Sequence, residues 1–115
     1  MSAIKQEARL MLEMGMGTDL HGGDYNKAAV RAVRDALYHS SLSFVRALDI
    51  DKDALPIRVT IGVQQPEAVD ADAIAAEFPI GKVTVEVVAG GLNVPDGARD
   101  DTAVIASAAI QVFTP

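Results

Sequence analysis

The sequence predicts an α+β fold in a single domain spanning residues 1–115. Three short segments alternate apolar and polar residues with a period of two, and a fourth is apolar on both faces, which is typical of strands. Two other segments carry apolar residues at three- and four-residue spacing, which is typical of amphipathic helices. Half of the 115 residues are hydrophobic. A chain of this length and composition is large enough to bury one core.

The first half of the chain predicts one strand and one long helix. The strand is expected at Arg9–Met16, where every second residue is apolar. Asp24 has the side chain of a good N-cap for a helix at Tyr25–Ser41, whose apolar residues form one stripe. Residues 41–55 are compatible with an extension of that helix or with a short second one. Pro56 ends any helix there.

The second half predicts three strands and one short helix. Ile57–Val63 has the clearest strand pattern in the chain. Asp70 is expected to cap a short helix at Ala71–Phe78, and a third strand is expected at Lys82–Val87. Asn93–Asp101 is rich in turn residues and is expected to be a loop. A long final strand follows at Val104–Val112.

This order, β-α-β-α-β-β, predicts a four-stranded mixed sheet with both helices on one face. The other face of the sheet then needs a cover, and a partner subunit is the economical one. The order is similar to the chorismate-mutase-like trimeric architecture, in which the sheets of three subunits pack around a three-fold axis with sites in the clefts between them. We therefore expect a homo-oligomer, and the resemblance implies a trimer.

Composition excludes several classes of function. The chain has no cysteine, which rules out disulfides, thiolate metal sites and a cysteine nucleophile. Its net charge is −6 with no basic cluster, which argues against nucleic acid or an anionic membrane as the main partner. No apolar run approaches the ~20 residues of a membrane span, and the first residues, MSAIKQEAR, lack the apolar region of a signal peptide. A cytoplasmic location is expected.

A glycine-rich turn, LMLEMGMGTDLHGGD at residues 10–24, is the main candidate site. Gly15, Gly17 and Gly22 predict backbone at positive φ or a close approach to the backbone. The turn leads into a helix N-terminus at Asp24, where free N–H groups and the helix dipole favour an anion. Lys27, one turn into the helix, adds a positive charge for an anionic ligand.

Asp19 and His21 are the candidate catalytic residues. They are two residues apart, so in an extended segment both side chains lie on one side. They predict either an oriented imidazole for acid–base chemistry or two ligands of a divalent metal. A zinc site normally has at least three protein ligands, and Asp24, Glu13 or a residue of a neighbouring subunit are the options for the third. His39 lies roughly 22 Å from the turn at 1.5 Å per residue and is predicted to be a helix-end residue favoured by the helix dipole.

A second candidate cluster contains Gly90, Gly91, Asn93, Asp96 and Asp100. In a trimer this segment would face the Asp19/His21 turn of the adjacent subunit and contribute to ligand binding. It is equally typical of an ordinary hairpin connection.

Two resemblances accompany these patterns. Residues 15–22, GMGTDLHG, resemble the GxGxDxHG signature of a small family of conserved hypothetical proteins without an established activity, and the likeness extends over nearly the whole chain. The first third is also similar to methylerythritol cyclodiphosphate synthases, trimeric metal enzymes that open with a strand, a glycine and an Asp-x-His turn. This second resemblance implies zinc on Asp19 and His21. The third histidine of those enzymes falls near Gly23 here and has no counterpart.

The leading interpretation is a small homo-oligomeric enzyme. Its site between subunits would use Asp19 and His21 on a small polar or anionic metabolite, and its cofactor is unknown. The alternatives are a non-catalytic metabolite-binding or regulatory module that uses the same turn, and a purely structural assembly protein.

Overall fold

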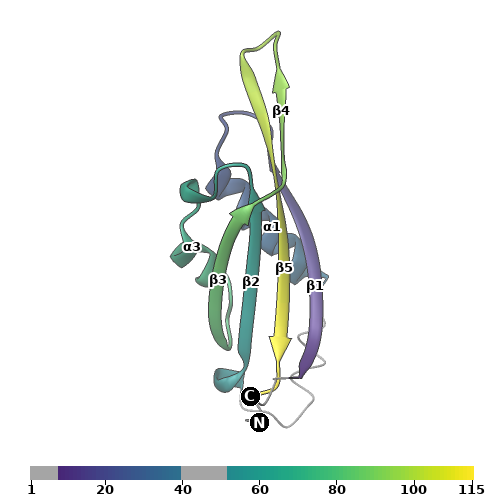
Figure 1. Cartoon of the computed structure of the whole chain (residues 1–115), viewed down its shortest axis with the longest axis vertical. Coiled ribbons are helices and arrows are strands. Elements are labelled where there is room, and N and C mark those ends of the chain that lie inside the picture. Colours follow the sequence, from purple (N-terminus) through teal and green to yellow (C-terminus); the bar gives the residue numbers. More distant parts are fainter. Residues whose placement is uncertain (1–7, 40–51) are drawn as a thin grey trace, which may run out of the picture.

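The computed structural model describes residues 8–39 and 52–115. In this part of the chain a mixed sheet is covered by helices on one face (Figure 1). Two short 3₁₀ turns, Lys52–Ala54 and Pro66–Ala68, connect the larger elements. The helices and strands are β1 Arg9–Asp19, α1 Tyr25–Tyr38, β2 Pro56–Val63, α3 Ala71–Ala75, β3 Lys82–Ala89, β4 Leu92–Asp96 and β5 Asp101–Phe113.

The sheet has five strands, one more than the sequence predicts. Its order is β1-β5-β2-β3, with β4 also paired to β5. β1, β2 and β4 are antiparallel to β5, and β3 is parallel to β2. The expected loop at Asn93–Asp101 is wrong, because the chain forms a hairpin there in which Leu92–Asp96 pairs with Asp101–Ile105. The sheet is mixed and both helices lie on one face, as predicted (Figure 1).

β4 and the first part of β5 form an arm, residues 92–105. β2 pairs with β5 only as far as Ser107, and β4 takes over the same side of β5 from Ile105. The arm therefore extends past the ends of β2 and β3, as the upper part of Figure 1 shows. All five residues of β4 are exposed.

The core lies between the sheet and the helices. Apolar residues at every second position of β2 and β5 point towards α1 and α3, and the helices supply small side chains on the facing side. The fully buried large side chains are Val33, Leu55, Ile57, Val59, Ile61, Val63, Ile74, Val104, Ile110 and Val112. Burial of this aliphatic surface is the main source of the stability of the fold.

The opposite side of the sheet, which we call the open face, has no helix over it in the described part of the chain. The alternate residues of the strands point to this face, and several of them are large, apolar and exposed. Met14 and Met16 on β1 are 71% and 62% exposed, and Leu92 on β4 is 60% exposed. Leu12, Val88 and Val94 share this exposure. The expectation that one face of the sheet lacks a cover within its own chain holds for the described residues.

β1 is an edge strand whose outer side is closed by α1. The backbone N–H of Met16 donates to Asp35 Oδ2 over 3.0 Å, and Arg31 donates to the backbone oxygen of Thr18 over 2.7 Å. These two side chains satisfy groups that an edge strand otherwise presents to solvent.

The predicted helix starts are confirmed. The carboxylate of Asp24 accepts the N–H of Lys27, and that of Asp70 accepts the N–H of Asp72. α1 ends at Tyr38, and the predicted continuation to Ser41 and most of the 41–55 segment lie outside the described residues. α3 ends at Ala75, three residues before the predicted end. No helix in the described ranges is long and apolar enough to cross a membrane.

Candidate functional site

The turn after β1 and the root of the β4–β5 arm meet at one end of the sheet. β1 reaches Asp19, which pairs with Val104 of β5, and the chain then turns through residues 20–24 into α1. Asp101, the first residue of β5, lies against this turn. Within one chain, the strand that follows the hairpin turn therefore brings Asp101 to this turn; the approach of residues 90–93 to the turn of a neighbouring subunit stays a prediction.

Asp19 is the only buried charged residue in the described part of the chain, with 4% of its surface exposed. Its Oδ2 accepts the backbone N–H of Asp24 over 2.9 Å. Its Oδ1 lies 3.7 Å from Arg31 and 4.0 Å from Lys27, whose side chains are about half exposed. Two cations and one backbone donor therefore surround this carboxylate. Asp19 joins the end of β1 to the start of α1.

His21 is paired with Asp101, not with Asp19. Its Nδ1 lies 3.1 Å from Asp101 Oδ2, and its side chain is 67% exposed. The predicted arrangement, with Asp19 and His21 on one side of an extended segment, is not what the structure shows. β1 ends at Asp19, so the two-residue alternation stops there, and the turn sends the imidazole outward while the carboxylate points inward.

Backbone donors hold the carboxylate of Asp101 in place. Its Oδ1 accepts the N–H of Thr102 over 2.8 Å and that of Gly22 over 3.3 Å. These bonds, and then the bond with His21, hold the pKa of Asp101 below its usual value. An ionised carboxylate at Nδ1 favours the tautomer with the proton on Nδ1, which leaves Nε2 free to accept or release a proton at the surface.

The glycines of the turn have two different roles. Gly22 and Gly23 adopt φ of +94° and +62°, which the sequence analysis expected for a tight turn. At Gly15 and Gly17 the predicted close approach to the backbone is confirmed, and it is made by α1. A Cβ on Gly15 would overlap the backbone of Ala32 and Ala36, and one on Gly17 would overlap the backbone of neighbouring residues of α1.

The second candidate cluster is tied to the first through α1. Asn93 Nδ2 donates to the hydroxyl of Tyr25 over 2.6 Å, so β4 contacts the first turn of the helix. Gly90 and Gly91 lie where the chain crosses from β3 to β4 beside the end of β2, and Gln64 Nε2 donates to the backbone oxygens of both. Gly91 has a φ of +63°. β3 and β4 do not pair with each other, so these two glycines lie in a crossing between strands and the hairpin-connection interpretation is wrong for them.

The donor set does not match a metal centre. No group of three His, Asp or Glu side chains comes together within residues 8–39 and 52–115. Asp19 faces two cations, Asp24 caps the helix, and His21 turns to Asp101. His39 is a helix-end residue, as predicted: it caps α1 and its Nε2 lies 3.4 Å from Asp35.

The sequence analysis missed Asp101 and Arg31 as site residues. Asp101 is 80 positions from His21, and no local pattern connects them. Arg31 lies about two turns into the predicted helix, and its guanidinium approaches Asp19 only because the end of β1 packs beside α1.

The fold and site define a small two-layer α+β protein with a helical face, an open sheet face and a surface His–Asp pair at one end. Residues 9–112 match the family described as conserved hypothetical protein (Lin0512_fam), and the chain belongs to this family. This confirms the predicted membership of a conserved hypothetical family.

The chain is also similar to a solved structure, described as an FtsZ-like protein of unknown function from Nostoc punctiforme. The two share 34% sequence identity with a TM-score of 0.79, over 94% of this chain and 96% of that chain. No curated protein matches this chain, so the distant resemblance to cyclodiphosphate synthases gains no support from sequence.

Proposed function

We propose that this protein binds a small polar or anionic metabolite beside the turn at residues 20–24, and that His21 exchanges a proton with it. The pairing of His21 with Asp101 carries the proposal. An imidazole oriented by an ionised carboxylate and exposed on its other side is suited to general acid–base catalysis near neutral pH. The half-exposed cations of Lys27 and Arg31, held at the end of β1 by Asp19, favour an anionic ligand.

The alternative is a non-catalytic binding or regulatory module that uses the same groups. In that case the cations select an anion and the exposed imidazole of His21 contributes a hydrogen bond to it. Both interpretations place the ligand beside groups of a single chain, so neither requires an assembly. They differ in whether the metabolite is consumed.

A screen of small carboxylates and phosphate esters tests the proposal. Compounds that raise the melting temperature are incubated with the protein and followed by NMR for consumption. We expect His21→Gln to lower turnover of a consumed compound by about a hundredfold or more, the usual contribution of a general acid or base. Asp101→Asn should also lower turnover, because it changes the favoured tautomer of the imidazole.

His39→Gln is the matched control. His39 is also an exposed histidine beside an aspartate, but it lies at the other end of α1. Equal losses in the two histidine variants would contradict the proposed site. A compound that stabilises the protein but is never consumed would favour the binding module over the enzyme. No response of the wild type to any compound would favour a purely structural protein.

A further inference from the structure

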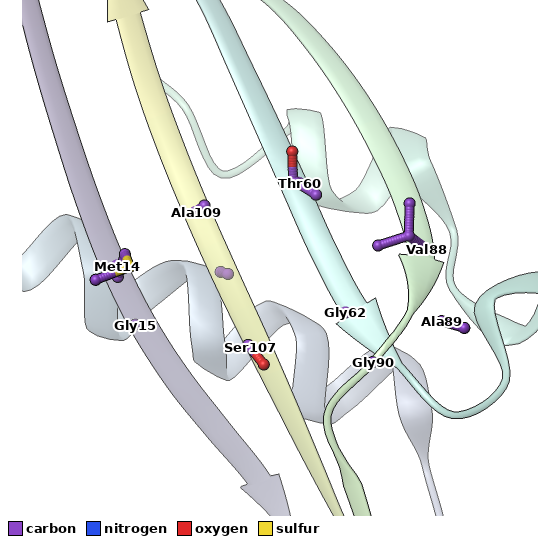
Figure 2. Close-up of a pocket in the computed structure, with 10 residues that line it drawn as sticks. Met14, Gly15, Thr60, Gly62, Val88, Ala89, Gly90, Ser107 and Ala109 are labelled. Atoms are coloured by element: carbon purple, nitrogen blue, oxygen red, sulfur yellow. The ribbon is translucent and has the colours of Figure 1, made fainter.

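The open face contains a hollow and a matching projection. The hollow has a volume of about 330 Å³. Its floor consists of small residues on the two central strands, and Met14 and Val88 form its sides (Figure 2). The residues of the floor include Thr60, Gly62, Ser107 and Ala109. The projection is Leu92 at the base of the arm, on the same face.

We propose that the open face binds a second copy of this chain, related by a two-fold axis that reverses the strand direction, so that Leu92 of each copy fills the hollow of the other. This inference does not rest on the proposed function. The apolar surface in question is larger than the scattered exposed residues of a typical monomer surface, and such patches mark interaction sites.

The strand register supports this arrangement. β2 pairs with one half of β5 and β4 pairs with the other half, and Ser107, where the pairing with β2 ends, is the middle residue of β5. A two-fold axis at Ser107 places Ile105 of one copy over Ala109 of the other. Leu92 pairs with Ile105, and Thr60 pairs with Ala109. Leu92 of one copy therefore lies over Thr60 of the other, within the hollow.

The charges at the two ends of the face are also complementary under this reversal. Asp96 near the tip of the arm pairs with Asp101. The same two-fold axis places Asp101 of one copy over Phe113 of the other. The guanidinium of Arg58 lies 4.6 Å from the ring centroid of Phe113. The arm of one copy therefore brings a carboxylate to the arginine of the other. Around the hollow, β2 and β5 present only uncharged side chains to this face, and Glu86 of β3 lies at its edge beside Thr60.

A two-fold arrangement also follows from where the apolar surface lies. An interface around a three-fold axis joins two different patches, whereas a two-fold interface joins a patch to itself. Among the described residues, the exposed apolar strand residues all belong to this one face. The face lies within a molecule of 55 × 35 × 19 Å. β5 has 13 residues, about 43 Å at 3.3 Å per residue, and four strands about 4.8 Å apart span about 19 Å. The face therefore offers on the order of the 800 Å² per partner that a stable interface needs.

Light scattering during gel filtration tests the proposal. We expect a mass of twice the 12.1 kDa chain. Leu92→Lys places a charge over the hollow, and Met16→Lys places one beside the axis, because Met16 pairs with Ser107. Each should raise the Kd of the dimer by about thirtyfold or more, the fold-change of a hot spot worth about 2 kcal/mol. Tyr38→Lys, at an 87% exposed position on α1, is the control and should leave the Kd unchanged.

A charge reversal tests the orientation of the two copies. Asp96→Arg should weaken the dimer, and Asp96→Arg combined with Arg58→Asp should recover part of the affinity. Circular dichroism melts verify that each variant is folded. A wild type that is monomeric at every concentration, a mass of three chains, or a dimer insensitive to both Leu92→Lys and Met16→Lys would overturn the proposal.

Discussion

The close contact between α1 and β1 makes a sharp prediction for Gly17→Ala. A Cβ at this position would overlap the backbone oxygen of Ala28 and the backbone nitrogen of Ala32. Ordinary contact begins at 3.4 Å, so α1 must move away from β1 by about an ångström. Overpacking of this kind typically costs about 1–3 kcal/mol. We expect the upper end, about 3 kcal/mol, because both opposing atoms belong to a helix backbone that has no alternative rotamer.

Urea unfolding at fixed protein concentration measures this loss, and a melting temperature about 12 °C lower should accompany it. Gly97→Ala is the control, because a Cβ there meets nothing within 4 Å and its φ is not positive. Removing the Ala32 methyl group should not rescue Gly17→Ala, since the overlap is with main-chain atoms. A loss below about 0.5 kcal/mol, the range of ordinary surface substitutions, would refute the reasoning.

Two further predictions concern the carboxylates of the site. Asp19→Ala removes the buried carboxylate that accepts the N–H of Asp24, and a hydrogen bond to a charged group contributes about 1.5–3 kcal/mol, so we expect a loss of that size in urea unfolding; Asp19→Asn keeps an acceptor and should cost less, and equal losses would contradict this account. The pKa of Asp101 is lowered in the folded state, so its contribution to stability is present above the unfolded pKa of about 3.9 and is lost as the pH falls through the lower folded value. Wild type and Asp101→Asn should therefore converge in stability as the pH falls below about 4, and a difference that grows towards acid would argue against it.

Local patterns predicted most of the elements. The alternation at Ile57–Val63 and the N-caps at Asp24 and Asp70 depend on residues close in sequence, and the structure confirms them. The arm was missed because its turn-rich sequence, with a proline at position 95, is typical of a loop. Its strand character depends on pairing with Asp101–Ile105, which the residues of β4 do not specify.

In the candidate site too, features set by neighbouring residues were predicted, whereas contacts between distant residues were not. The sequence identified the turn and the two residues that distinguish it, Asp19 and His21. It could not assign their partners, because Asp101 reaches His21 across 80 positions. It also attributed Gly15 to ligand binding, although a glycine required by a neighbouring helix and one required by a ligand look alike in a single sequence.

The closed outer side of β1 has a consequence for how copies of this protein can join. Edge strands with free N–H and C=O groups invite the addition of further strands, and with it continuous sheets and fibrils. Asp35 occupies the N–H of Met16, and Arg31 occupies the backbone oxygen of Thr18. A strand from another chain would have to displace both side chains before it could add along this half of β1. The same helix that completes the core on one side thus hinders the addition of a strand at this edge of the sheet.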